Sequence, residues 1–189
     1  MTPVLIDLSR FLLRDFGESD RGEFVSYQAD PRYLALYDLD GGDARRAQDL
    51  FDRFLEWQAT NPRANIQLGI FDRRTGGLCG CAGLRDIGDG TAVLGIELAP
   101  EQWGRFGTAL DVTTALLDYG FSALGLDTIL GSTASGNARV AKLARWFGAS
   151  IVAERDGPTW MTARGWREVD WAVGRNAWRD APRRNAHSE

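Results

Sequence analysis

The stretch EQWGRFGTALD, from Glu101 to Asp111, places two glycines three residues apart between a strand-like run and a helix-like run. A strand that ends in Gly-x-x-Gly and continues into a helix leaves the first N–H groups of that helix unpaired and facing the loop. Phosphate is a natural ligand there. Gly104 and Gly107 remove side chains that would block approach, and Arg105 adds a positive charge. The glycines could equally serve only to shape a turn, so the stretch alone identifies no ligand.

Strand and helix patterns surround this loop. Ahead of it, residues 65–72, 78–87 and 92–98 are typical of strands, and the turns between them carry Gly and Asp, which predicts an antiparallel meander. After it, apolar side chains recur at three- and four-residue spacing, and Gly125 is placed to end the helix. A strand, a helix that Gly148 ends, and three closing strands are expected at 127–133, 137–147, 149–155, 158–163 and 166–174.

The first sixty residues predict two strands followed by two helices. These elements are expected at 4–8, 10–16, about 20–28 and about 43–60. Together with the later elements they make the fold class mixed α/β. We expect a single domain over residues 1–180 and a polar, disordered tail over residues 181–189.

The composition argues against several classes of protein. Twenty-two Lys and Arg against 26 Asp and Glu give a net charge of -4, so the overall charge predicts no nucleic-acid partner. No apolar run is long enough for a membrane span and no signal-peptide pattern is present, which predicts a cytoplasmic protein without a membrane partner. Cys79 and Cys81 lack further zinc ligands nearby, and the sole histidine, His187, lies in the polar tail. Neither a metal site nor a histidine-based triad is therefore expected.

A resemblance to a known family rests on two segments at a fixed separation. LGIELAPEQWGRFGTALDVTTALLDYGFSALGLDTI, from Leu94, resembles the strand, pyrophosphate loop and helix of the GNAT superfamily of acyl-CoA N-acyltransferases, and most closely its ribosomal-protein N-acetyltransferase branch. GNARVAKLARWFGA, ending at Ala149, resembles the Asn-led helix of that family. The opening FLLRDFGESDRGEFVSYQADPRY and the closing REVDWAVGRNAW are similar to that branch's two ends. The resemblance implies a strongly bent, mostly antiparallel central sheet with helices on both faces.

The resemblance also implies a co-substrate, acetyl-CoA or another acyl-CoA, with no metal. Leu98 and Ala99 would offer backbone groups to its pantetheine arm, Asn137 would touch the arm from the other side, and Lys142 or Arg145 would meet an outer phosphate. The basic residues could instead belong to a solvated helix face. The pyrophosphate would be held by the amides of Gly104, Arg105, Phe106, Gly107, Thr108 and Ala109.

The sequence departs from the family in three places. Phe106 makes the loop one residue longer than the usual Trp-Gly-x-Gly, Val140 stands where a serine is common, and Ala144 stands where many relatives carry a proton-donating tyrosine. A CoA thiolate is a tolerable leaving group, so solvent could protonate it. The same departures keep a non-catalytic acyl-CoA-binding or sensing module as an alternative.

The reaction implied is direct attack of a neutral amine on the thioester in a ternary complex, with N–H groups near Leu98 stabilising the oxyanion. Deprotonation at pH 7 costs roughly 4–5 kcal/mol for a lysine-like amine but only about 1 kcal/mol for an α-amine. An α-amine, of a protein N-terminus or an amino-acid-like molecule, is therefore the expected acceptor. Glu97 is the candidate base, acting through water. An exposed or salt-bridged carboxylate is the competing interpretation.

The first two helices and their connection are expected to determine which acceptor binds. Tyr27, Tyr33 and Tyr37, with the acidic segment at 38–43, are candidate wall residues, although aromatic residues at such spacing also form cores. A small-molecule amine, in detoxification or natural-product modification, remains an alternative acceptor. The partners expected are thus acyl-CoA, an amine, and, as an alternative to a monomer, a second copy in a homodimer.

Overall fold

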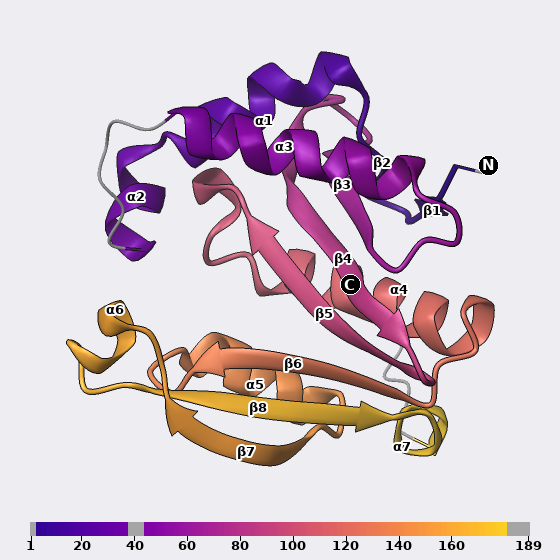
Figure 1. Cartoon of the computed structure of the whole chain (residues 1–189), viewed down its shortest axis with the longest axis vertical. Coiled ribbons are helices and arrows are strands. Elements are labelled where there is room, and N and C mark those ends of the chain that lie inside the picture. The colour runs from indigo at the N-terminus through magenta and orange to yellow at the C-terminus, as the bar shows by residue number, and fades with distance from the viewer. Residues whose placement is uncertain (1–2, 38–43, 181–189) are drawn as a thin grey trace.

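The computed structural model describes residues 3–37 and 44–180, which form one open sheet of eight strands (Figure 1). The tail at 181–189 and the acidic segment at 38–43 lie outside the described residues. The order across the sheet is β1-β2-β3-β4-β5-β6-β8-β7, and all neighbours are antiparallel except β5 and β6. In chain order the strands are β1 (Leu5–Asp7), β2 (Phe11–Asp15), β3 (Ile66–Asp72), β4 (Leu78–Gly88), β5 (Thr91–Leu98), β6 (Thr128–Ala134), β7 (Ser150–Asp156) and β8 (Arg167–Gly174). The predicted mixed, mostly antiparallel sheet is confirmed.

Helices cover both faces of this sheet (Figure 1). The helices and helical turns are η1 (Glu18–Asp20), α1 (Arg21–Gln28), α2 (Pro31–Tyr37), α3 (Ala44–Ala59), η2 (Pro100–Gln102), α4 (Phe106–Asp118), the π-helical turn η3 (Tyr119–Ala123), α5 (Ala138–Trp146), α6 (Thr159–Thr162) and α7 (Arg175–Asp180). Helices α1 and α3 pack on one face, and α4 and α5 pack on the other.

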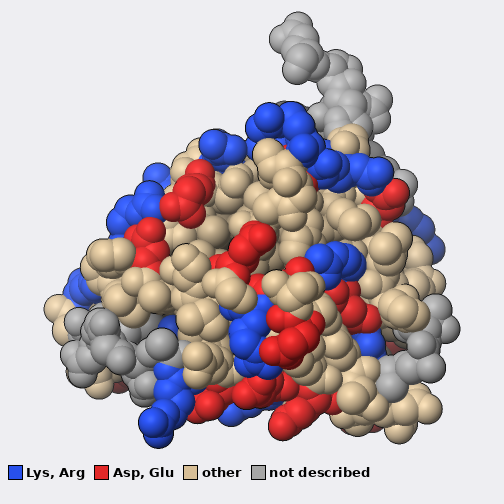
Figure 2. All heavy atoms as spheres, turned by 90° about the horizontal axis from the view of Figure 1, so that it is seen from above, with Lys and Arg blue, Asp and Glu red and all other residues tan. Residues whose placement is uncertain are grey.

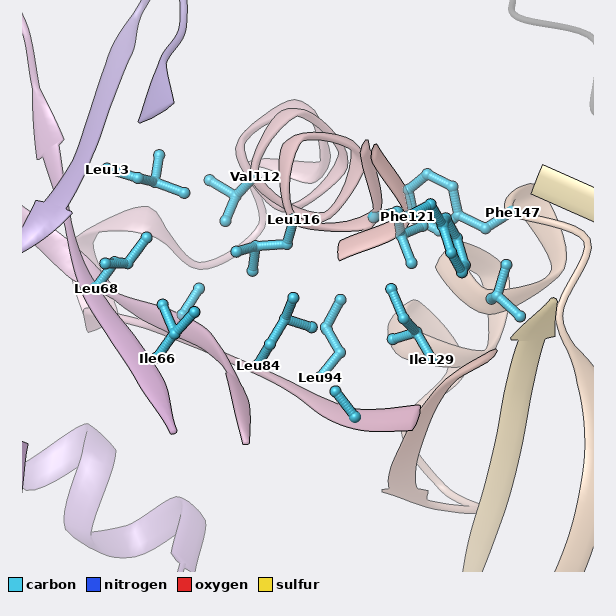
Figure 3. Packing of buried hydrophobic residues seen from close by; sticks show 14 of the residues in the cluster. Leu13, Ile66, Leu68, Leu84, Leu94, Val112, Leu116, Phe121, Ile129 and Phe147 are labelled. Carbon is cyan, nitrogen blue, oxygen red and sulfur yellow. The ribbon is translucent and has the colours of Figure 1, made fainter. Parts of the chain in front are cut away.

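The two faces carry separate hydrophobic clusters because successive side chains of a strand point to opposite sides. In β3, Leu68 joins the cluster under α4 and α5, whereas Phe71 joins the aromatic cluster under α1 and α3. Figure 3 shows the first cluster, where Leu68 and Leu84 of the sheet face Val112 and Leu116 of α4. Burying each such side chain contributes about 1.5–3 kcal/mol.

Strands β5 and β6 separate over most of their length. They pair only through Thr91–Val93 and Thr128–Leu130, at their first residues. From there β5 continues beside β4 to Leu98, while β6 continues beside β8 to Ala134 (Figure 1). The divergence leaves the end of β5 without a neighbour on its β6 side, immediately before the glycine-containing loop.

Most predicted elements are present, but one predicted strand is wrong and two helices, α2 and α7, were not predicted. The strand expected at 158–163 is wrong, because Pro158 precedes the short helix α6. Helix α2, which follows Asp30 and begins at Pro31, was not predicted. The two glycine helix ends are confirmed, because Gly125 and Gly148 both have φ of 69°, which favours glycine.

Charged side chains of both signs alternate on the face seen from above in Figure 2, which carries α1 and α3. Arg21, for example, bonds to both Glu18 and Asp52. Within residues 3–37 and 44–180, no helix combines the length and the apolar composition of a membrane span.

Candidate active site

Leu98, the last residue of β5, directs its backbone into the gap beside β6. It lies opposite Gly80 of β4, whereas the next pair, Ala99 and Cys79, is joined by a hydrogen bond from N to O of 2.9 Å. Because opposed residues alternate between bonded and non-bonded pairs, the N–H and C=O of Leu98 point away from β4. The indole Nε1 of Trp103 donates to Leu98 O at 2.8 Å. The N–H of Leu98 is therefore directed into the gap, while that of Ala99 is engaged with β4.

The loop that follows has an open surface at both glycines. Gly104 has φ of 84°, and a Cβ added at Gly104 or Gly107 would meet no atom within 4 Å. The loop's own carbonyls accept hydrogen bonds of 3.1–3.2 Å from the N–H groups of Arg105, Phe106 and Thr108. Thr108 Oγ1 is buried and has no hydrogen-bond partner among the described residues.

Helix α5 approaches this loop from the other wall of the gap. Asn137 caps the helix, its Oδ1 accepting from Val140 N at 3.2 Å, so its amide nitrogen is the atom left for a ligand. Lys142 Nζ lies 5.0 Å from the centre of the Phe106 ring, within range of a cation–π contact. The extra loop residue, Phe106, thus packs against the core on one side and holds a lysine on the other.

The carboxylate of Glu97 is held by three neutral donors on the first two helices. Tyr27 Oη donates to Oε1 at 2.8 Å, Tyr33 Oη donates to Oε2 at 2.6 Å, and Gln28 Nε2 donates to Oε1. Arg46 Nη2 donates to Gln28 Oε1 at 2.8 Å, which turns the amide nitrogen of Gln28 toward Glu97. The competing interpretation of a salt-bridged Glu97 is not supported, because within the described residues no cation pairs with it.

Burial and the charge of Glu97 keep the neighbouring groups protonated. Burial is the largest cause that raises the pKa values of Tyr27 and Tyr33 well above the usual value for tyrosine. The charge of Glu97 is the next cause for Tyr33, and for Tyr27 it follows the interaction with Cys81. Burial, and then the charge of Glu97, raise the pKa of Tyr37 to about 12. The thiol of Cys81, opposite Glu97 in the sheet, also has a raised pKa because it is buried. Cys81 is therefore a poor nucleophile, and the tyrosines act as donors at neutral pH.

Helices α2 and α6 meet across the open side of the gap. Arg164, just after α6, donates to the carbonyls of Ala35 and Leu36 at 3.3 Å and lies over the rings of Trp160 and Trp166. The Tyr37 and Trp160 rings are 6.2 Å apart. These contacts join the helix that carries Tyr33 to the second half of the sheet.

The structure therefore brings the predicted residues together in two groups. In the first group, the loop follows Leu98 at the end of β5, and Lys142 of α5, the helix that Asn137 caps, reaches Phe106 of that loop. In the second, Glu97 forms a cluster with Tyr27 and Tyr33 on the face under α1 and α3. Sequence reasoning missed Gln28, whose position directly after Tyr27 gave no signal of its contact with Glu97. It also missed Arg85, a cation within the otherwise apolar run that begins at Leu78.

A family model described as an acetyltransferase (GNAT) domain matches residues 10–150. An uncharacterized N-acetyltransferase, YoaA of Bacillus subtilis (strain 168), is 29% identical over 132 residues, which cover 68% of this chain and 72% of that protein. The family-model match contains β5, the glycine-containing loop, α4 and α5.

Solved structures share the fold over more than nine tenths of the chain. Ribosomal-protein-S5-alanine acetyltransferase from Vibrio fischeri aligns with a TM-score of 0.77 at 16% identity, covering 93% of this chain and 98% of that one. Spermidine N-acetyltransferase from Vibrio cholerae, in complex with CoA and spermine, aligns with a TM-score of 0.74 at 18% identity, covering 92% and 100%. At these identities the likeness establishes the fold alone.

Proposed function

This chain belongs to the acetyltransferase (GNAT) domain family, and on that premise we propose that it transfers an acetyl group, or another acyl group, from acyl-CoA to a primary amine. The expected acceptor is an α-amine, of a protein N-terminus or of an amino-acid-like molecule. The observation that carries the proposal is the juxtaposition, at the end of β5, of the Glu97 carboxylate with the gap-facing N–H of Leu98.

Three observations support an acyl-CoA site in the gap. The loop between β5 and α4 is open at Gly104 and Gly107, so an elongated anion can approach its backbone. The N–H of Leu98 is available beside it, and Lys142 adds a positive charge from α5. We assign the pantetheine arm to Leu98 and the amide of Asn137, and the pyrophosphate to the loop from Gly104 to Ala109.

Glu97 is suited to receive the acceptor amine. A carboxylate offers about four lone-pair positions, of which two on Oε1 and one on Oε2 are taken by Gln28 and the two tyrosines. One position on Oε2 remains for the amine or for a bridging water. Among the described residues no cation neutralises Glu97, so its negative charge favours binding of an ammonium. The carboxylate can then accept a proton from that ammonium.

The reaction balances without a further reactant. Acyl-CoA, when bound, supplies an acyl thioester whose carbonyl carbon bonds to the amine nitrogen as the C–S bond breaks. Glu97 passes the ammonium's first proton to water and takes the second from the nitrogen as the C–N bond forms, and CoA leaves as a thiolate that solvent protonates. The N–H of Leu98 faces the side on which the carbonyl oxygen would gain charge.

Two alternatives differ in what they predict. A polyamine-type small molecule is a second acceptor class, since the Vibrio cholerae neighbour is a spermidine N-acetyltransferase. A non-catalytic acyl-CoA-binding module is supported by Val140 and Ala144, neither of which carries a proton donor.

A thiol-release screen tests the proposal. Acetyl-CoA and longer acyl-CoAs are combined with a peptide bearing a free N-terminus, α-amino acids and spermidine, and binding of each acyl-CoA is followed by the melting temperature. We expect a melting shift with acyl-CoA and thiol release with an α-amine. A melting shift with no thiol release from any amine would leave only the binding module, and no melting shift would refute the acyl-CoA site.

A further inference from the structure

Arg85, near the middle of β4, is a half-buried cation that has no ion-pair partner among the residues that the structure describes. Its side chain lies across Gly95 of β5, where an added Cβ would overlap Arg85 Nη2. Within residues 3–37 and 44–180, Arg85 forms no ion pair and no hydrogen bond to another side chain. Holding a guanidinium away from bulk water without a partner is costly, so an anionic ligand would be strongly favoured at this position.

Arg85 and Glu97 lie on the same face of the sheet. The register places Cys81 opposite Glu97, Gly83 opposite Gly95, and Arg85 opposite Val93. Residues two apart on a strand point to the same side, so the Arg85 and Glu97 side chains share the side covered by α1 and α3. The strip of sheet between them, at the pair Gly83 and Gly95, carries no side chain of its own.

The two charges are close but are not paired with each other. Because the Arg85 guanidinium lies over Gly95, only one two-residue step of β5, about 6.6–6.8 Å, separates that position from Glu97. Both charges affect the pKa of the Cys81 thiol. Burial raises this pKa most, the charge of Glu97 raises it further, and the charge of Arg85 lowers it. A cation and an anion therefore stand about one two-residue step of strand apart, across the pair Gly83 and Gly95.

We propose that Arg85 binds an anionic group of the acceptor while Glu97 receives its amine, so that the acceptor is dipolar, with a carboxylate beside the reacting nitrogen. This inference rests on the proposed function and narrows it to the class of free α-amino acids and closely similar zwitterions. A guanidinium suits this role because it binds a carboxylate through two parallel hydrogen bonds.

The arrangement selects against the other acceptor classes. A peptide N-terminus places a neutral amide where the carboxylate would stand, and a polyamine places a methylene group or a second cation there. Both leave the guanidinium unpaired, and the polyamine adds repulsion. The acceptor order expected is therefore α-amino acid first, then peptide, then polyamine.

The experiment compares one α-amino acid with its carboxamide and with the decarboxylated amine, in wild type, Arg85→Met, Arg85→Lys and Gly95→Ala. Wild type is expected to use the free acid with kcat/KM at least about tenfold above that for the amide, the effect of a charge-assisted pair. Arg85→Met should reduce this ratio to about one, and Gly95→Ala should reduce it by displacing the guanidinium. Arg53→Met, at an exposed arginine of α3, is the matched control and should keep the wild-type ratio.

The readouts separate failure of this inference from failure of the proposed function. Equal use of acid and amide by wild type, or an unchanged ratio in Arg85→Met, overturns the inference while amine acetylation stands. If no amine leads to thiol release, the dipolar site is tested by binding instead. Binding of the amino acid to the CoA-bound protein is measured by the melting temperature of the protein. A shift in wild type that is lost in Arg85→Met supports the dipolar site, and no shift in wild type refutes it. If Arg85→Met does not fold, the ratio of kcat/KM for acid and amide, measured in wild type and in Arg85→Lys, decides the same question.

Discussion

Tyr33 Oη lies 2.6 Å from Glu97 Oε2, joining a short helix near the N-terminus to the end of the central strand β5. Tyr33 is 4% exposed, and its hydroxyl points at a carboxylate rather than at solvent. With Tyr27 and Gln28 it fixes where the one remaining lone pair of Glu97 points. The helix α2 therefore contributes to the chemistry through the orientation of Glu97.

Tyr33→Phe should lower kcat about ten- to hundredfold with a smaller change in KM for acyl-CoA. The substitution removes a hydrogen bond to a charged group, worth about 1.5–3 kcal/mol. Tyr37→Phe is the matched control, because the Tyr37 ring lies 4.8 Å from that of Tyr33, tilted by 49°, and within the described residues Tyr37 forms no hydrogen bond to Glu97. Steady-state kinetics check both, and an undiminished kcat in Tyr33→Phe would remove this tyrosine from the mechanism.

The two loop glycines should differ in what a methyl group disturbs. Gly104→Ala should destabilise the fold by about 1–2 kcal/mol because φ at Gly104 is 84°. Gly107→Ala lies in the first turn of α4 with open space around it, so stability should hold or rise slightly. The affinity of the Gly107→Ala variant for CoA should nevertheless fall severalfold. Urea unfolding and CoA titration measure the two effects, and full CoA affinity in Gly107→Ala would argue against the proposed phosphate site.

Lys142 and Arg145 can be told apart by their effect on CoA binding. Lys142→Met should weaken CoA binding roughly fivefold, the effect of about 1 kcal/mol from an exposed charge, and should reduce its salt dependence. Phe106→Leu should act in the same direction because it removes the ring under the ammonium. Arg145→Met, on the same helix, should bind as wild type does. The reverse result would transfer the phosphate contact to Arg145.

Alkaline pH should destabilise the protein through its buried tyrosines. The pKa of Tyr37 is raised to about 12 by burial and by the charge of Glu97, against about 10 in the unfolded chain. A raised pKa means that the folded state holds its proton longer, so the stabilisation is complete below pH 10 and is lost as pH rises toward 12. Urea unfolding between pH 9 and 12 should show this loss, and Tyr37→Phe should make the slope shallower. A stability independent of pH over this range would contradict the assignment.

Much of the fold follows from local sequence patterns. Gly125 and Gly148 end their helices with the same positive φ, and the meander of β3, β4 and β5 follows from apolar runs separated by Gly and Asp turns. The strand expected at 158–163 is absent. The β-forming residues Thr159 and Trp160 follow Pro158 and lie in helix α6, where the Trp160 ring contacts that of Tyr37. Tertiary contact overrode local propensity at that point.

The site was less predictable than the fold. The proposed cofactor loop is continuous in sequence, so its glycines could be found without a structure. The donors to Glu97 lie some seventy residues earlier, at Tyr27 and Tyr33, and their contact depends on how α1 and α2 dock on the sheet. The approach of Arg85 to Gly95 depends on the register of β4 against β5, which no local pattern fixes.

The most direct test of amine acetylation is a mass measurement of the product, made with wild type and Glu97→Gln in the presence of acetyl-CoA and an α-amino acid. We expect wild type to form one N-acetylated amine for each thiol released, and Glu97→Gln to be slower by about a hundredfold or more, while still binding acetyl-CoA. Binding of acetyl-CoA by wild type without any acetylated amine, across the full acceptor panel, would contradict the account.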